Sequence, residues 1–187
     1  MKYSAPPLFF FERIIFNMKI NIVDSYPGKN DAKLLKIDDA RIIYRDFSGD
    51  KTKFSNGKRS FSVLIDDPHI ADLLEENGYT VKRPVNDADD GRELPMHMKV
   101  KVKYNANGPD IYLVTNGVMT KVPEERVADL DRIRIISADM DIRAYDGEYA
   151  GKPFRSAYLN SMRVYQQVDR FMEEYLAQQS NSEELPF

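Results

Sequence analysis

The chain has 187 residues, of which 42% are hydrophobic and 30% charged, and its formal net charge is −3. This composition is that of a soluble globular protein with a real core, and it excludes a disordered chain and a membrane protein. The chain has no cysteine and only two histidines, so disulfides, thiolate metal sites and histidine-rich metal sites are also excluded. A cysteine-free chain fits the reducing cytoplasm.

Charge is distributed unevenly along the chain. From residue 169 onward five acidic residues accompany a single arginine, so this segment carries −4. The preceding residues therefore sum to +1, and their basic residues are clustered. The total charge argues weakly against a nucleic-acid ligand, but a mildly basic body followed by an acidic tail is a recognisable polarity.

The expected elements can be read in chain order. Residues 1–17 are expected to be an N-terminal extension, either non-native or an arm, because their apolar run is too short and interrupted for a signal peptide or a membrane span. Hydrophobic periodicity and turn residues then predict the first half of the chain: a segment 36–47 that ends in a β-rich run at 40–47, strands at 59–65 and 79–83, loops at 48–58 and 86–93, and a helix at 68–77. The same signals predict the second half: strands at 97–104 and 111–115, a small helix at 123–130, a long strand or a bent pair at 133–145, a turn at 147–153, an extended segment at 156–168, a helix at 169–177 and a disordered tail from 178.

These elements predict a mainly β fold with short helices. Six or seven strands without a βαβ rhythm indicate a closed or partly closed barrel rather than a doubly wound sheet. We expect one domain over residues 18–177, followed by the tail 178–187.

The chain lacks the signatures of common enzymes. No glycine-rich loop leads into Lys-Ser or Lys-Thr, and no G-x-S-x-G segment or Cys/His pair indicates a nucleophile. Acid pairs such as Asp66-Asp67 and Asp89-Asp90 lie beside turn signals, which is typical of solvated loops and helix caps. We therefore expect no catalytic residue, no metal and no cofactor. A metal-dependent DNA-processing nuclease, or an accessory subunit of one, is the alternative.

A row of lysines is the strongest binding signal. In 97–104, apolar residues alternate with Lys99, Lys101 and Lys103, so the lysines face outward from a barrel at intervals of about 6.5 to 7 Å. This spacing is close to that of phosphates along an extended single strand. The competing interpretation is an edge strand that its lysines protect from aggregation.

Aromatic residues are interleaved with basic ones elsewhere. Single-strand binders combine cationic grooves with aromatic platforms, although any one such ring is more often part of a core. The candidate DNA-binding residues are Tyr44, Lys53, Phe54, Lys58, Arg59, Lys99, Lys101, Lys103, Tyr112, Arg143, Tyr145 and Tyr149.

The chain ends in Glu183-Glu184-Leu185-Pro186-Phe187. This segment resembles the acidic tip of bacterial single-stranded DNA-binding proteins, in which acids precede a hydrophobic-Pro-Phe terminus. A free carboxylate, a ring and two negative charges need only an apolar pocket with a basic rim on a partner. The resemblance implies recruitment of replication or recombination proteins through this tip.

The body resembles the phage-type single-stranded DNA-binding proteins. The resemblance lies in 58–68, 73–82, 141–146 and 157–162. It implies an OB-fold, built on a five-stranded barrel with extra strands, that coats transient single strands in the cytoplasm of a bacterial host. Where family members often carry an aromatic residue such as Trp, this chain has Tyr79 and, near the second place, Gly147. A homodimer is left open, and no membrane partner is expected.

Overall fold

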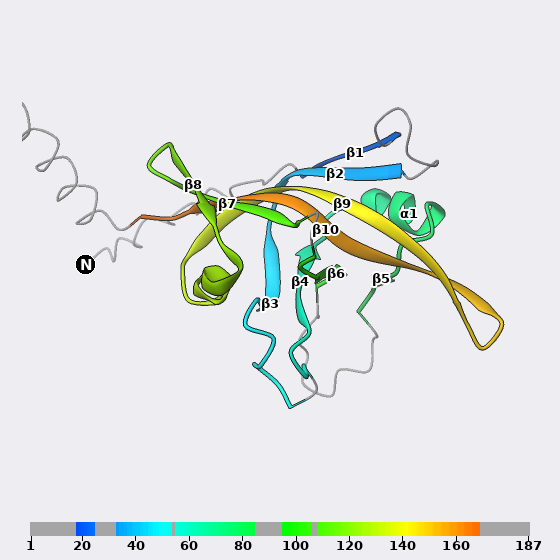
Figure 1. Cartoon of the computed structure of the whole chain (residues 1–187). Helices are drawn as coiled ribbons and strands as arrows, with labels where there is room; N and C mark the ends of the chain where they lie inside the picture. The colour runs from blue at the N-terminus through cyan, green and yellow to red at the C-terminus, as the bar shows by residue number, and fades with distance from the viewer. Residues whose placement is uncertain (1–17, 25–32, 54, 85–94, 106–107, 169–187) are drawn as a thin grey trace, which may run out of the picture.

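The computed structural model describes residues 18–24, 33–53, 55–84, 95–105 and 108–168. Within these ranges the chain forms one ten-stranded sheet, an α-helix and a 3-10 helix (Figure 1). The elements in chain order are β1 (Lys19–Asp24), β2 (Lys33–Ala40), β3 (Ile42–Asp46), β4 (Arg59–Leu64), α1 (Pro68–Glu76), β5 (Val81–Lys82), β6 (His97–Val102), β7 (Asp110–Thr115), β8 (Val118–Val122), η1 (Glu124–Asp131), β9 (Ile135–Tyr149) and β10 (Lys152–Gln166). The predicted mainly β fold with short helices is confirmed.

Five strand segments make an OB-fold-like barrel. Hydrogen-bonded neighbours follow the order β2-β9-β10-β6-β4-β3, in which only the β10–β6 pair is parallel. The two ends of this path, β2 and β3, are halves of one bent segment that Arg41 separates. No hydrogen-bonded ladder joins β2 to β3 among the described residues, so the sheet does not close on itself. The result is a partly open barrel.

Four further strands extend the barrel. β1 pairs with β2 at one end of the sheet, and the short β5 pairs with β6. The β7–β8 hairpin joins the C-terminal half of β10 through parallel pairing of β7. Figure 1 shows the β9–β10 hairpin as a long arm that reaches beyond the other strands.

The core lies inside the barrel because apolar residues alternate with polar ones along each strand. On β2, for example, Leu35 and Ile37 are fully buried, whereas Lys36 and Asp38 are exposed. The largest fully buried side chains come from the barrel strands, from residues that adjoin them, and from α1, β7 and η1: Phe47, Phe61, Leu35, Ile37, Ile65, Leu74, Met98, Ile111, Leu130, Ile142, Leu159 and Met162.

Helix α1 begins and ends close to the predicted positions. The Asp67 carboxylate accepts a hydrogen bond from the backbone N–H of His69 at 2.9 Å, and Pro68 occupies the first turn. The helix stops at Asn77 because Gly78 follows with a φ of +81°. No helix in the described ranges is long and apolar enough to cross a membrane.

Several predictions about elements were wrong. Strands β1 and β8 were not expected, and the sheet has ten strands rather than six or seven. The expected turn over 147–153 is a two-residue turn at Ala150-Gly151, where φ is +51° and +74°. The predicted helix 169–177 and the tail lie outside the described residues.

Candidate nucleic-acid interface

Three lysines, two on β6 and one directly after it, line the outer face of the barrel. Lys99, Lys101 and Lys103 are exposed, while the alternating apolar side chains of β6 are buried, as predicted. Strand β6 pairs with β4 on one side and with β10 and β5 on the other. It is therefore an interior strand, and protection of a sheet edge does not explain its lysines.

A row of side chains crosses four strands on this face. The register places Ser60 of β4 opposite Lys101, Lys101 opposite Tyr158 of β10, and Tyr158 opposite Arg143 of β9. The Lys101 ammonium lies 5.3 Å from the centre of the Tyr158 ring and donates a hydrogen bond to Ser156 Oγ at 2.9 Å. Cations and a ring thus alternate across the sheet.

The surface above this row is hollowed. A groove of about 610 Å³ is lined by Gly57, Lys58, Arg59, Ser60, Lys99, Lys101, Val102, Lys103, Tyr104, Glu124 and Tyr158, and we call it the β6 groove. Three neighbouring hollows each share residues with it: one with Lys103 and Tyr158, one with Lys99 and Lys101, and one with Lys58, Ser60 and Lys99. The four hollows share these lining residues along β6, and we call the four together the channel.

Aromatic rings continue the channel along the β9–β10 arm. Tyr145 packs edge-on against Tyr158, with ring centres 6.0 Å apart, and lies 6.5 Å from Phe154. Tyr145 is 57% exposed and Tyr149, beside the turn, is 80% exposed. Because residues of one parity on a strand share a face, these rings form one exposed aromatic row.

Gly147 makes room for this row. A Cβ atom at position 147 would lie 2.6 Å from Cζ of Phe154, so the ring covers the place where a side chain would stand. Gly147 pairs with Phe154 in the register of β9 and β10. The glycine that sequence reasoning assigned to a turn therefore lies within β9, where it accommodates the Phe154 ring.

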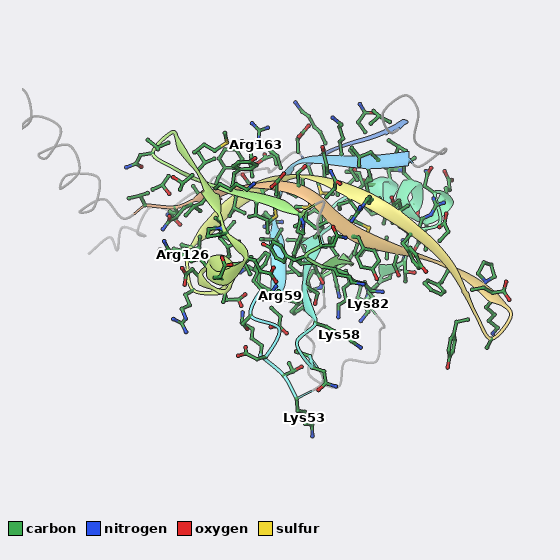
Figure 2. All side chains as sticks on the ribbon, viewed as in Figure 1. Lys53, Lys58, Arg59, Lys82, Arg126 and Arg163 are labelled. Atoms are coloured by element: carbon green, nitrogen blue, oxygen red, sulfur yellow. The ribbon has the colours of Figure 1, made fainter. Side chains whose placement is uncertain are left out.

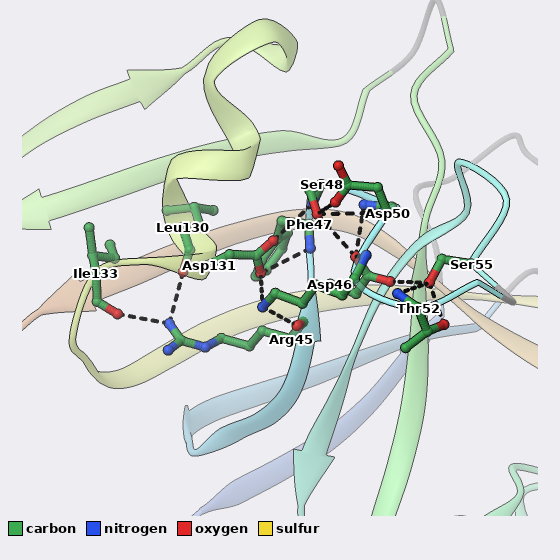
Figure 3. Close-up of polar contacts among 12 residues, drawn as sticks. Arg45, Asp46, Phe47, Ser48, Asp50, Thr52, Ser55, Leu130, Asp131 and Ile133 are labelled. Atoms are coloured by element: carbon green, nitrogen blue, oxygen red, sulfur yellow. Dashed lines mark hydrogen bonds and ion pairs between the residues drawn. The ribbon is translucent and has the colours of Figure 1, made fainter.

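The β3–β4 loop, which borders the groove, is held by two carboxylates (Figure 3). Asp46 accepts hydrogen bonds from Ser55 Oγ at 2.6 Å and from the backbone N–H of Gly49 at 2.9 Å. Asp131 of η1 accepts from the backbone N–H groups of Phe47 and Ser48, and forms an ion pair with Lys51 at 3.0 Å. Asp46 and Asp131 thus hold this loop in place without any ligand.

The environment of Asp46 favours its ionised form. Burial alone would raise the pKa of this carboxyl group, but hydrogen bonds from Ser55, Lys51, Gly49 and Ser48 outweigh burial and lower the pKa below its ordinary value. Asp46 is thus an anion that organises the loop through its hydrogen bonds, and it also lines the hollow that contains Lys58, Ser60 and Lys99.

Most of the predicted residues meet in the channel. Lys58, Arg59, Lys99, Lys101, Lys103, Arg143 and Tyr145 line it, and Tyr44 lines its edge, where its ring lies 5.0 Å from that of His97. Tyr149 extends the aromatic row to the end of the arm. Lys53 lies at the tip of the β3–β4 loop, on the same side of the molecule as Lys58 and Lys82 (Figure 2).

Tyr112 lines a separate hollow of about 560 Å³, together with Arg163, Asp139 and Asp141. Phe54 and the acidic tip 183–187 lie outside the described residues. The described residues contain no cluster of three or more His, Asp or Glu side chains that could hold a metal ion.

Sequence reasoning left Phe154 and Tyr158 out of the candidate set. Their period-two spacing with Ser156 was a usable signal, because it places all three on one face of a strand. Glu124 had no such signal, since only the folded chain brings η1 next to the start of β4. Tyr104 was left out because the alternation places it on the same face as the buried residues of β6, opposite the lysines.

The domain profile described as "Putative phage ssDNA-binding domain" matches residues 28–185, which is most of the chain. The chain belongs to this family of phage single-stranded DNA-binding proteins. The predicted resemblance is confirmed, and the match includes every element from β2 to β10.

A solved structure of a phage protein shares the fold of this chain. The single-stranded DNA-binding protein from bacteriophage Enc34 in complex with ssDNA is 15% identical, with a TM-score of 0.50 over 80% of this chain and 98% of that chain. The C-terminally truncated form of the same protein is also 15% identical, with a TM-score of 0.49 over 79% and 96% of the two chains. No curated protein matches the chain.

Proposed function

We propose that this member of the family binds single-stranded DNA in the channel along β6, without sequence preference, and so protects it. The observation that carries the proposal is the row of exposed lysines on an interior strand beside an exposed aromatic row. OB-folds bind oligonucleotides on the face of their second and third strands. The loop between strands one and two and the loop between strands four and five also take part. Here those parts are β4, β6, the β3–β4 loop and the β9–β10 turn.

The chemistry of the channel fits an unpaired strand. Phosphates would lie against Lys58, Lys99, Lys101, Lys103 and Arg143, and each phosphate that is neutralised releases counterions. Bases would stack on Tyr145, Tyr149 and Tyr44, and stacking is worth roughly 1–3 kcal/mol per base whatever the sequence. Lysine ammonium groups and ring faces do not read base edges, so the binding should tolerate any sequence.

The Enc34 protein supports this proposal because one of its structures is a complex with ssDNA. Contacts of DNA with Lys53, Phe54 and Tyr112 stay predictions. Tyr112 would reach DNA only if the strand continued past the channel to β7.

The role we propose is non-enzymatic and needs no cofactor. A metal-dependent nuclease is the alternative, and incubation of labelled single strands with Mg²⁺ or Mn²⁺ separates the two. Intact strands after saturation with protein would support a binding role, whereas shortened products would contradict it.

We further propose that the tip 183–187 recruits replication, recombination or repair proteins in the host cytoplasm. Its two acids, proline and terminal phenylalanine offer a partner charge, a ring and a carboxylate. Removal of residues 183–187 should leave DNA affinity unchanged or higher and abolish recruitment. A large loss of DNA affinity would contradict this division of labour.

Titration with oligo-dT tests the binding proposal directly. The exposed tyrosines of the channel should lose fluorescence when bases stack on them, and the affinity should fall steeply and linearly on a log–log plot against salt. Duplex DNA of equal length is the control. An absence of quenching even at low salt would overturn the proposal.

A further inference from the structure

An ion pair closes one end of the β6 groove. Arg59, the first residue of β4, donates a hydrogen bond from Nη1 to Glu124 Oε1 at 2.6 Å. Glu124 begins η1, which is 65 residues farther along the chain. Both side chains line the groove, and both remain partly exposed to solvent.

A buried hydroxyl lies beside this ion pair. Arg59 stacks over the Tyr104 ring at 5.3 Å from its centre, and Tyr104 lines the same groove. The Tyr104 hydroxyl is buried and has no hydrogen-bond partner within the described part of the chain. A buried donor without an acceptor destabilises the protein, so such a group marks a place where an acceptor from outside would be favourable.

The surroundings of Tyr104 keep its hydroxyl protonated. Burial raises the pKa of Tyr104 to about 12, and the nearby Glu124 and Glu125 act in the same direction although Arg59 opposes them. At neutral pH the hydroxyl is therefore a hydrogen-bond donor that needs an anionic or carbonyl oxygen.

We infer that Arg59 and Tyr104 form a phosphate site that Glu124 occupies in the free protein, and that a phosphate of the bound strand displaces Glu124. The carboxylate of Glu124 is an anion that bonds to the guanidinium as a phosphate oxygen would. Lys58 and Lys103, adjacent in sequence to Arg59 and Tyr104, line the same groove and would add two cations for the incoming phosphate. This inference rests on the proposed DNA-binding function and adds a competing internal anion to it.

The exchange has a distinct effect on salt dependence. A phosphate that binds Arg59 releases its own counterion. The displaced Glu124 carboxylate, however, takes up a counterion from solution. This contact therefore releases almost no net counterion. In the Glu124→Gln variant no carboxylate competes with the phosphate for Arg59. The log–log slope of DNA affinity against salt concentration should therefore be steeper by about 0.7 than in the unmodified protein. Release from a partly exposed ion pair should also raise affinity about two- to fivefold.

Glu125→Gln is the matched control. Glu125 is the next residue, is also exposed, and makes no ion pair among the described residues. Both variants remove one negative charge close to the groove, so a general electrostatic effect would change both alike. Affinity and salt slope for oligo-dT, measured by fluorescence anisotropy from about 0.05 to 0.3 M salt, should change more in Glu124→Gln than in Glu125→Gln.

Two further variants test the roles of Arg59 and Tyr104. In an Arg59→Gln background, Glu124→Gln should have no more effect than Glu125→Gln. Tyr104→Phe should lower DNA affinity about two- to fivefold while keeping or raising the thermal unfolding midpoint, because it removes a buried hydroxyl without a partner. A merely structural tyrosine would instead lose stability and affinity together.

The outcomes separate this inference from the proposed function. If the unmodified chain binds oligo-dT and the Glu124 and Glu125 variants have equal slopes and affinities, the phosphate site is refuted while DNA binding stands. If the unmodified chain does not bind oligo-dT at low salt, the proposed function itself fails.

Discussion

Replacing Lys99 and Lys103 with glutamine should make the salt dependence of DNA binding measurably shallower. Lys99 is exposed on the outer face of β6, Lys103 is exposed directly after the strand, and neither forms an ion pair with an acid in the described part of the structure. Each is therefore available to neutralise one phosphate, which contributes about 0.7 to the log–log slope for a single strand. The double variant should lose about 1.4 from the slope.

The expected slope translates into a simple comparison. Between 50 and 200 mM salt the unmodified protein should lose about sevenfold more affinity than the double variant. Lys19→Gln is the control, because Lys19 is exposed on β1, at the opposite end of the sheet path from β4 and β3. Equal slopes for the double variant and the unmodified protein, or an equal change in Lys19→Gln, would refute the assignment of phosphates to β6.

Three other predictions concern the rings, the loop carboxylate and the loop glycines. Tyr145→Ala should weaken oligo-dT binding about 5- to 150-fold, as the loss of 1–3 kcal/mol of stacking implies, and Tyr145→Phe should bind normally in the same anisotropy assay. Because the pKa of Asp46 is lowered by folding, its contribution to stability is present above its unfolded pKa of about 3.9 and is lost as pH falls through the lower folded value. Asp46→Asn should therefore flatten the acid limb of a urea-unfolding profile measured from pH 2 to 7, and an unchanged limb would contradict this. Gly49→Ala and Gly57→Ala both place a side chain at positive φ, at a cost of about 1–2 kcal/mol. Only at position 49 would the added Cβ also lie against backbone atoms, at 2.8 Å, so Gly49→Ala should lower the unfolding free energy more than Gly57→Ala. Equal unfolding free energies for the two variants would count against the loop geometry.

Local patterns in the sequence were enough to find the lysine row. Alternation along β6 depends only on the period of a strand, so the outward lysines and buried apolar residues could be assigned without knowing their neighbours. What alternation could not show was that β6 is an interior strand. That fact depends on pairing with β4 and β10, whose residues are distant in sequence.

Errors arose where a residue has one meaning locally and another in the fold. Gly147 indicates a turn in isolation, yet in the structure it lies within β9 because Phe154 from the paired strand needs its space. Strand β8 was missed because its residues are mostly exposed on both faces, so it has no buried alternation to detect. The contact between Arg59 and Glu124 joins two elements that no sequence pattern connects.

Lysines and rings should contribute to binding in ways that salt can separate. Counterion release weakens as salt rises, because the free-energy gain from releasing an ion falls when the solution already holds many. Stacking involves no counterions, and charges farther apart than about 8 Å are largely screened at physiological ionic strength, so the net charge of −3 has little influence inside the channel. The Lys99/Lys103 double variant should therefore converge with the unmodified protein at high salt, whereas Tyr145→Ala should stay weaker by a constant factor at every salt concentration. If the tyrosine deficit also vanished at high salt, Tyr145 would act through the placement of cations and not as a platform for bases.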